Sequence, residues 1–528
     1  MSSTGVSSCD APCLPGQTAC RTHAVRLLLI NPGVPESFWS LRWAVRDVLP
    51  GKRSVNPPLG LATVAALSPP DWQVTIVDEN IEPVPAHPDA DIVGICGMGV
   101  QFERQCALLR RYRSEGYYTV AGGSFASLCP ERYAGIADTV VSGEAERIWP
   151  QFCADYERRG APPAALYRET EVVDLAWSPT PRFDLLRLSR YTTATVQFSR
   201  GCPYRCEFCD IIVMFGRKPR HKSLAQVERE LDALRVQEVR SVFFVDDNLI
   251  GNPAVARELL AFLVGYQRRH GNPFRFGTEV SINLARQPDL LALCRDAGFT
   301  WVFIGVESPD PEALKLAKKT QNMAEDVLVS IRRIYGYGID VLAGLIVGFD
   351  TDTPAAFGSQ LRFLLASGIQ LAMVGLLTAL PKTPLYERLA AAGRLRTGDG
   401  GADNTRPATN IVPLRMTYEQ LVEGYEQLYR TLTADSAIAK RIRNKLRYMG
   451  NPVRDTTYPA RQQAQIVLRF LLRGIVPGGP VRWLHFLRSI PWRRPRHLYL
   501  VINDWILGLA MRDYVDRHFP GAANRSVR

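Results

Sequence analysis

The chain has 528 residues, of which 46% are hydrophobic and 22% charged, a balance that is ordinary for a folded globular protein and excludes a mainly disordered or fibrous one. Its apolar runs stay below the ~20 residues of a membrane-spanning helix, and the nearest, residues 498–510, is interrupted by Asn503 and Asp504. The net charge of +12 is concentrated in residues 431–528, which carry 18 Lys and Arg against 5 Asp and no Glu. We therefore expect this C-terminal tail to have an electrostatic role of its own.

Residues 1–24 are rich in Ser, Pro, Gly and Thr, which predicts a disordered leader. They lack the apolar core of a secretory signal, so a cytoplasmic protein is expected. The 11 cysteines are too sparse for a disulfide scaffold, and those scattered in apolar surroundings are predicted to be buried thiols. Cys202, Cys206 and Cys209 differ from the rest because they form one tight group.

Short apolar runs alternate with helical segments over residues 25–155, a pattern typical of a parallel, doubly wound α/β sheet. Each run ends in a loop of glycine or short polar residues, and ligands of such sheets bind beyond the carboxyl ends of the strands. The predicted strands are 26–31, 74–77, 91–96, 118–121 and 139–141, with helices at 59–67 and 102–115.

A proline-rich stretch, residues 156–190, is predicted to be a linker. A second alternation of strands and helices follows over residues 191–410. Its six units indicate an open or partial (β/α)6 barrel with its chemistry at the carboxyl ends of the strands. Residues 411–528 are predicted to form a mainly helical, basic region. The six strands are expected at 195–199, 241–245, 274–280, 301–306, 341–347 and 371–380.

The three grouped cysteines have the spacing C-x3-C-x2-C and follow directly on the first strand of the second domain. Three thiolates on one short loop can ligate three irons of a [4Fe–4S] cluster and leave the fourth iron open. A structural zinc ion is an alternative, but it usually takes four ligands, and the nearest histidine is His221. An inert trio of thiols is the remaining alternative.

The stretch from Gly201 to Asp210 resembles the cluster loop of the radical S-adenosylmethionine (SAM) superfamily, with an aromatic residue before the third cysteine. The resemblance implies that SAM binds the open iron. Positions that match the family's SAM contacts fall at the ends of successive strands. They are Phe208 in the loop, Asp246, Asp247 and Asn248 for the methionine amino group, Glu307 for the ribose, Ile346 and Gly348 for the adenine side, and Glu279 as a further candidate.

The first domain resembles the Rossmann-like cobalamin-binding domain that precedes this barrel in the B12-dependent branch of the superfamily. Small residues suit loops whose backbone must approach a large flat ligand. No histidine ligand to cobalt is expected, because the D-x-H-x-x-G motif is missing and only His23 and His87 lie in this domain; residues 31–56 form the loop in which we would seek a lower axial ligand. A generic Rossmann-like domain with another ligand, or none, is the alternative. The predicted cobalamin contacts are Asp78, Asn80, Gly97, Met98, Gly99, Gly122, Gly123, Ser124, Gly143 and Glu144.

Four stretches are very similar to the hopanoid C-2 methylases, namely residues 196–211, 244–248, 350–354 and 379–385. The likeness implies a cobalamin-dependent C-methyltransferase acting on a hopanoid-like lipid or another natural-product skeleton. Such an enzyme cleaves one SAM to a 5′-deoxyadenosyl radical, which takes hydrogen from an unactivated carbon, and methylcobalamin, remade from a second SAM, supplies the methyl group. An external electron donor of the flavodoxin or ferredoxin type is also implied.

Other functions remain open at the level of sequence. The same cofactors could serve a rearrangement, a cyclisation or an oxidation without methyl transfer. An RNA methylthiotransferase would need a second cluster on three cysteines of the first domain, and Cys96, Cys106 and Cys129 do not have that family's spacing. Nucleic acid is therefore not expected as a partner. A cluster- or B12-bearing sensor is the non-enzymatic alternative.

The tail mixes arginines with large apolar side chains, including Trp483, Trp492 and Trp505. Basic amphipathic helices of this kind suit an anionic membrane surface, and peripheral binding to the inner face of the membrane is our first interpretation. Helices packed on the barrel with a solvated basic face are the second interpretation. Binding of RNA phosphates is the third.

Overall fold

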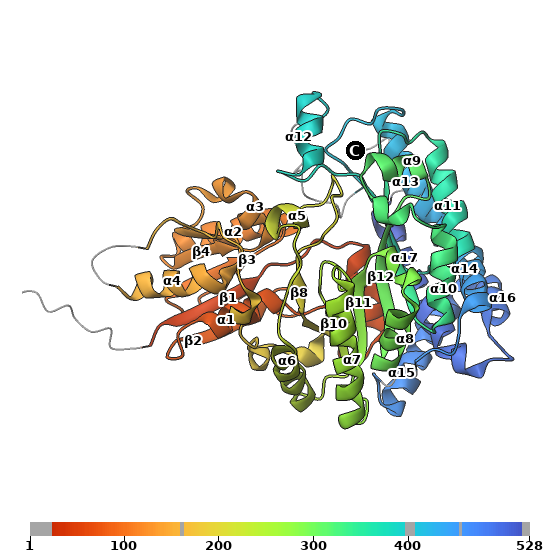
Figure 1. The fold of residues 1–528 in the computed structure, drawn as a ribbon, viewed down its shortest axis with the longest axis horizontal. Coiled ribbons are helices and arrows are strands. Elements are labelled where there is room, and N and C mark those ends of the chain that lie inside the picture. Colours follow the sequence, from red (N-terminus) through yellow and green to blue (C-terminus); the bar gives the residue numbers. More distant parts are fainter. Residues whose placement is uncertain (1–23, 159–162, 397–406, 454–456, 520–528) are drawn as a thin grey trace, which may run out of the picture.

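The computed structural model describes residues 24–158, 163–396, 407–453 and 457–519. Two parallel six-stranded sheets form the body of the molecule, and a helical region lies against the outer helices of the second sheet (Figure 1). This architecture confirms the predicted α/β class, with a Rossmann-like first sheet, a partial barrel and a mainly helical C-terminal region.

The first sheet has the strand order β2-β1-β3-β4-β5-β6, and every neighbouring pair is parallel. The chain moves outward from β1 to β2 and then returns to the other side of β1, so the order reverses between β1 and β3. Ligands of doubly wound sheets bind at such a reversal. The elements are β1 (Arg26–Asn31), α1 (Leu59–Leu67), β2 (Gln73–Asp78), β3 (Ile92–Cys96), α2 (Phe102–Ser114), β4 (Tyr118–Gly122), α3 (Ser124–Leu128), β5 (Thr139–Ser142), α4 (Ala145–Glu157) and β6 (Leu166–Arg168).

Strand β6 lies inside the range that the sequence predicts to be a linker. It adds an edge strand to the first sheet, with Val140 of β5 opposite Leu166. Of its three residues only Tyr167 is buried, and so short an alternation gives no recognisable strand pattern. The proline-rich stretch therefore completes the first sheet before the chain enters the barrel.

The second sheet has the order β14-β13-β12-β11-β10-β7, in which all neighbours are again parallel. Strands β7 and β14 form its two edges, so the barrel stays open. A short antiparallel ribbon of β8 and β9 follows β7. The elements are β7 (Ala194–Val196), β8 (Ser199–Arg200), α5 (Ile211–Met214), β9 (Arg220–His221), α6 (Leu224–Val236), β10 (Ser241–Phe244), α7 (Pro253–Arg269), β11 (Arg275–Val280), α8 (Pro288–Ala297), β12 (Phe299–Glu307), α9 (Pro311–Leu316), α10 (Val327–Gly336), β13 (Asp340–Val347), α11 (Ala355–Ser367) and β14 (Ala372–Leu376).

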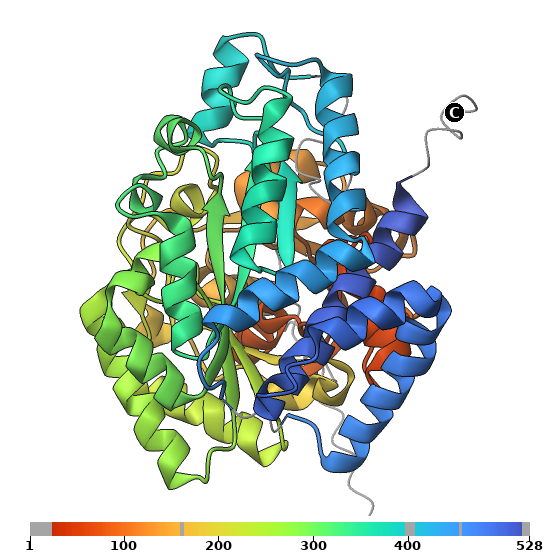
Figure 2. The same ribbon diagram turned by 90° about the vertical axis from the view of Figure 1, so that its right-hand side faces the viewer.

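The helical region packs on the barrel through α14, which contacts α10 and α11 (Figure 2). Trp505 is fully buried in this region, and its indole N–H donates to Ser489 Oγ at 2.9 Å; the packed-helix interpretation of the tail holds for this part. None of the helices in the described ranges has the length and apolarity to cross a bilayer. The helices of this region are α13 (Tyr418–Leu432), α14 (Asp435–Tyr448), α15 (Ala460–Phe470), α16 (Gly479–Ser489) and α17 (Leu498–His518), and α12 (Pro384–Ala391) lies apart from them at the barrel mouth.

The loop that follows β1 joins all three regions. Its first short helix, η1 (Phe38–Ser40), places the ring of Phe38 4.0 Å from that of Tyr429 in α13. The next residue, Trp39, lies 5.5 Å from the ring of Phe303 in β12. A second short helix, η2 (Ala44–Val48), packs against α15 and α17. The reversal point of the first sheet is thereby tied to the barrel and to the helical region.

Candidate active site

The three cysteines lie on the loop between β8 and β9. Gly201 opens this loop with a φ of +93°, and three carbonyl oxygens lie 3.1–3.3 Å from where its Cβ would be. A side chain does not fit there without displacing backbone. The Gly201 N–H donates to Asp247 at 2.7 Å. Cys206 is buried, whereas Cys202 and Cys209 are partly exposed at the surface of the loop.

The cluster loop is also braced from the far side of the barrel mouth. Arg388 of α12 donates to Glu207, the residue between Cys206 and Phe208, at 2.8 Å and to Asp350 at 2.6 Å. Burial favours the neutral form of Asp350, but hydrogen bonds from Arg394 and Arg388 outweigh it and lower the pKa of this carboxyl. Arg388 therefore links Asp350, in the 350–354 stretch, to Glu207 in the cluster loop.

The polar residues after β10 hold the same loop. Asp246 accepts from the backbone N–H groups of Phe198 and Ser199, both at 2.8 Å. Burial raises the pKa of Asp246 to about 7 and that of Asp247 to about 6. Asn248 accepts from the backbone N–H that follows β11 at 3.1 Å, while its Nδ2 is buried without a partner among the described residues. Both carboxylates thus already support the loop, and Asn248 is the member of this group with a free donor.

Glu307 ends β12 with a φ of +62°, a conformation that is uncommon for a residue other than glycine. Lys319 Nζ donates to Glu307 Oε1 at 2.8 Å, and a Cβ on Gly305 would lie 2.3 Å from that oxygen. The ammonium also lies 6.0 Å from the centre of the Phe208 ring. Burial disfavours the charged lysine, but Glu307 and the nearby thiols of the cluster loop outweigh it and raise the pKa of Lys319. A cation whose side chain is only 13% exposed therefore lies beside the cluster loop.

Buried amide side chains surround this pair. Asn322 donates to the carbonyl of Gly305 at 2.9 Å, Gln360 donates to that of Ile346 at 3.2 Å, and Gln321 Nε2 lies 3.7 Å from Cys206 Sγ. A buried polar atom without a partner costs free energy, so these groups indicate a polar ligand at this edge. Among the buried side-chain atoms of the described structure that have no hydrogen-bond partner are Asn322 Oδ1, Gln360 Oε1, Gln321 Oε1 and Asn248 Nδ2.

The inner surface of the barrel is largely apolar. Along β12, Trp301 and Phe303 are half-buried and alternate with fully buried residues, so they lie on the face turned away from the covering helices. The ring of Phe243 lies 5.2 Å from that of Trp301, and Gly277 leaves room for the indole, which a Cβ there would meet at 2.0 Å. Glu279 lies on β11, and burial, together with the neighbouring aspartates after β10, raises its pKa to about 7.

At the carboxyl edge of the first sheet, the loops after β3 and β4 pack backbone against backbone. The Gly97 N–H donates to Gly122 at 3.1 Å, and a Cβ on Gly123, whose φ is +102°, would lie 2.4 Å from the Gly97 oxygen. The fold itself therefore requires Gly97 and Gly123 to be small. Gly122 has open space at its Cβ position and Met98 is 50% exposed, so the edge presents a free surface. Gly99 and Ser124 begin the segments that follow these two loops.

Asp78 and Asn80 hold the loop after β1. Asp78 accepts from Asn31 at 2.9 Å and from the Tyr191 hydroxyl at 2.7 Å, and Asn80 accepts from the Val34 N–H at 2.9 Å. Because Tyr191 precedes β7, this contact also fixes the entry into the barrel. Their predicted contact with cobalamin stays a prediction, since the observed partners are protein groups.

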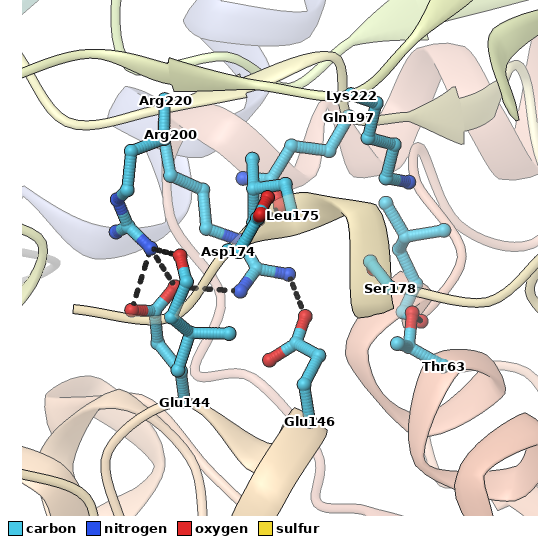
Figure 3. Close-up of polar contacts among 12 residues, drawn as sticks. Thr63, Glu144, Glu146, Asp174, Leu175, Ser178, Gln197, Arg200, Arg220 and Lys222 are labelled. Atoms are coloured by element: carbon cyan, nitrogen blue, oxygen red, sulfur yellow. Dashed lines mark hydrogen bonds and ion pairs between the residues drawn. The ribbon is translucent and has the colours of Figure 1, made fainter. Parts of the chain in front are cut away.

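The two domains meet in a buried set of ion pairs, which we call the interdomain clamp: Glu144, Glu146, Arg200 and Arg220. Arg200 donates to Glu144 and to Glu146, both at 2.7 Å, and Arg220 donates to Glu144 at 2.9 Å (Figure 3). All four side chains are at most 12% exposed.

Burial raises the pKa of Glu146, but the charge of Arg200 outweighs burial and the net shift of this pKa is downward. Gly143, with a φ of +111°, starts the turn that carries the glutamates. The clamp connects the turn after β5 to the ribbon that holds the cysteines.

His87 is exposed in the loop between β2 and β3, whereas His23 lies outside the described residues. The described ranges contain no group of three or more His, Cys, Asp or Glu side chains arranged around a single ion. A [4Fe–4S] cluster does not need that arrangement, because each cysteine binds a different iron. The unpaired amides and the largely buried lysine suit the amino-acid and adenosine parts of SAM, and the open glycine edge of the first sheet suits a large flat ligand.

Known proteins share both the sequence and the architecture. Residues 196–364 match the radical SAM superfamily, and residues 383–521 match a domain of unknown function, DUF4070. An uncharacterised methyltransferase of Synechocystis sp. is 39% identical over 412 residues, which cover 77% of this chain and 76% of that protein. The hopanoid C-2 methylase of Rhodopseudomonas palustris is 35% identical over 421 residues, covering 79% and 78%. In structure, the cobalamin-dependent SAM radical enzyme OxsB, with aqua-cobalamin and SAM bound, has a TM-score of 0.59 at 16% identity, over 93% of this chain and 80% of that one.

A cysteine loop at the mouth of a partial barrel, beside a Rossmann-like sheet, is the arrangement of a two-domain radical SAM enzyme. The chain belongs to the radical SAM superfamily and, within it, to the methyltransferases that include the hopanoid C-2 methylase. The superfamily implies a [4Fe–4S] cluster and SAM as cofactors, and the fold of the whole chain is shared with an enzyme that binds cobalamin as well.

Three groups of this site are not predictable from the sequence alone. Lys319 lies in an ordinary-looking loop, and no local pattern singles it out. Arg388 is one of many arginines, and its role depends on a contact across the barrel mouth. Arg200 directly precedes the cluster loop, and this adjacency to Gly201 was the one signal available.

Proposed function

We propose that this enzyme methylates an unactivated carbon of a hopanoid-like lipid or another apolar natural-product skeleton. The observation that carries this proposal is the apolar inner surface of the barrel, where Phe243, Trp301 and Phe303 stand below the polar edge that suits SAM. A polycyclic hydrocarbon offers few hydrogen-bonding groups, so a surface of this kind suits it. The likeness to a hopanoid C-2 methylase supports the same substrate class.

When bound, the cluster, SAM and cobalamin together supply hydrogen abstraction and a transferable methyl group. The residues of the chain itself bind SAM and orient the substrate. Lys319 presents a cation to the carboxylate of SAM, Glu307 presents a carboxylate to the ribose hydroxyls, and Asn248 offers a free N–H donor. Trp301 and Phe303 exclude water from the carbon that reacts. The interdomain clamp fixes the two cofactor-binding edges relative to each other.

We also infer that the enzyme works in the cytoplasm at the inner face of the membrane and receives electrons from a flavodoxin or ferredoxin. A lipid substrate supports the first inference. The second follows from the chemistry, because the cluster must be reduced by one electron before it can cleave SAM. No histidine lies in the loop after β1, which supports cobalamin bound without a histidine lower ligand.

The test is anaerobic turnover of the reconstituted enzyme with a strong reductant, SAM and diploptene. We expect 5′-deoxyadenosine, S-adenosylhomocysteine and a lipid heavier by one methyl group. The Cys206→Ala variant, which removes a cluster ligand, should give none of the three. Deoxyadenosine without S-adenosylhomocysteine would favour a rearrangement, cyclisation or oxidation. Methylation of a tetrapyrrole in preference to the hopanoid would contradict the substrate class.

A further inference from the structure

The outer hairpin, residues 460–489, carries an exposed apolar face. Its inner face is buried in the helical region through Ile466, Phe470 and Phe486. The opposite face carries large aliphatic side chains that are 44% to 63% exposed, and such a concentration marks an interaction surface. Figure 1 shows α15 and α16 at the periphery of the molecule. The exposed residues are Leu468, Leu472, Val476, Val481, Leu484 and Leu487.

The charge of this surface has a single sign. Residues 460–498 contain eight arginines and no acidic residue. Two of the arginines are paired with the body of the protein, Arg473 with Asp47 and Arg482 with Asp435. The others form no ion pair with any residue that the structure describes. Trp492, 74% exposed, lies in the loop beyond the hairpin beside Arg493 and Arg494.

The exposed aliphatic side chains and the unpaired arginines of the outer hairpin together favour one kind of partner. A second copy of the chain would bring two wholly positive faces together, which costs free energy. RNA would neutralise the arginines but would leave six aliphatic side chains without an apolar partner. An anionic bilayer provides a partner for the arginines and for the aliphatic side chains. The aliphatic and tryptophan side chains enter the boundary of head groups and acyl chains, while the arginines bind the phosphates.

We propose that the outer hairpin and the loop of Trp492 dock the enzyme on an anionic lipid surface. The benefit of docking to catalysis rests on the proposed lipid substrate, whereas the binding to lipid does not. The hairpin is continuous with the loop after β1, since Gly474 lies against the ring of Trp43 and Arg473 binds Asp47. That same loop carries Trp39, which contacts Phe303 on the inner surface of the barrel. The docked face and the apolar interior are therefore joined through one segment.

The experiment is flotation of the full-length holoenzyme with vesicles, either phosphatidylcholine alone or phosphatidylcholine mixed with phosphatidylglycerol. The test variant is Leu472→Glu with Leu484→Glu. The matched control is Val172→Glu with Val236→Glu, which introduces the same charges at two sites that are 75% and 77% exposed elsewhere. A third variant, Arg461→Gln with Arg488→Gln and Arg493→Gln, removes charge alone. Circular dichroism is the check that each variant is folded.

We expect the wild type and the valine control to float with the anionic vesicles, and the leucine variant to bind at least about tenfold more weakly. The arginine variant should lose binding to anionic vesicles, as should the wild type at high salt. Equal flotation of the leucine variant and the wild type would overturn the proposal. So would a dimer in the absence of vesicles that the leucine variant abolishes, or RNA binding that competes with the vesicles. Flotation needs no turnover, so its failure is distinct from a failure to methylate.

Discussion

Arg200, the residue before the cluster loop, donates to Glu144 of the first domain at 2.7 Å across the domain boundary. The same guanidinium holds Glu146, so both of its Nη atoms bind the first domain. The cluster loop begins at the next residue. Any movement of the turn after β5 is therefore transmitted to the ribbon that carries the cysteines.

Glu144→Gln should uncouple the two halves of the reaction. The substitution weakens the buried ion pairs of Glu144 with Arg200 and Arg220 while the hydrophobic core remains, so we expect SAM cleavage to continue. Methyl transfer needs the two cofactor-binding edges in the correct relative position, and a misplacement of about 1 Å can lower the rate ~100-fold. The ratio of methylated product to 5′-deoxyadenosine is the quantity to measure. Glu171→Gln, at an exposed carboxylate that pairs with Arg147, is the control. An equal fall of both products would show that the clamp serves only the cluster.

Lys319→Met should weaken SAM binding. The variant removes a largely buried cation, and a hydrogen bond to a charged group contributes ~1.5–3 kcal/mol, which corresponds to ~10–150-fold in affinity. Equilibrium binding of SAM to the cluster-loaded protein measures the effect, and iron analysis checks that the cluster is retained. Lys318→Met changes the exposed neighbour and should leave affinity unchanged. Loss of iron with unaltered affinity per cluster would assign Lys319 to the cluster loop instead.

Lys445→Met should lower the melting temperature. Lys445 Nζ donates to Asp340 of β13 and to Asp504 of α17, both at 2.8 Å, and all three side chains are buried. Removing the cation leaves two carboxylates without their partner, a change that costs ~3–5 kcal/mol. Calorimetry should show no comparable change for Lys440→Met, an exposed lysine of the same helix. Similar melting temperatures for both variants would rule out the triad as a stabilising contact.

Acid should weaken the attachment of α17 to the loop after β1. Burial raises the pKa of Glu36, but hydrogen bonds from Arg517 and Arg42 outweigh it and lower the value to about 2. A carboxylate with a depressed pKa stabilises the folded state above its unfolded value near 4.5 and loses that contribution as the pH falls toward 2. We expect about 1 kcal/mol after solvent screening.

The measurement for Glu36 is denaturant unfolding at pH 7 and at pH 3. Glu36→Gln should be less stable than the wild type at pH 7, and the gap should narrow at pH 3. Glu115→Gln, in the surface pair with Arg111, is the control and should be close to the wild type at both values. A gap for Glu36→Gln that is independent of pH would contradict the ion-pair explanation.

The sequence by itself determined the class of the fold and the reaction type. Buried parallel strands are continuous apolar runs, and the glycine loops and cysteine spacing are equally local, so β1, β3 and the cluster loop were predictable. Strand β6 was not, because three residues carry too little pattern and its place depends on pairing with β5.

Only the tertiary structure decided which charged groups act together. Glu144 and Arg200 lie 56 residues apart, and Glu207 and Arg388 lie 181 apart; no local pattern specifies such partners. The tertiary structure also decided which part of the tail is packed on protein, because Trp505 is buried whereas Trp492 is 74% exposed. An amphipathic pattern is the same for a helix that packs on protein and for one that meets a membrane, so long-range packing alone separates them.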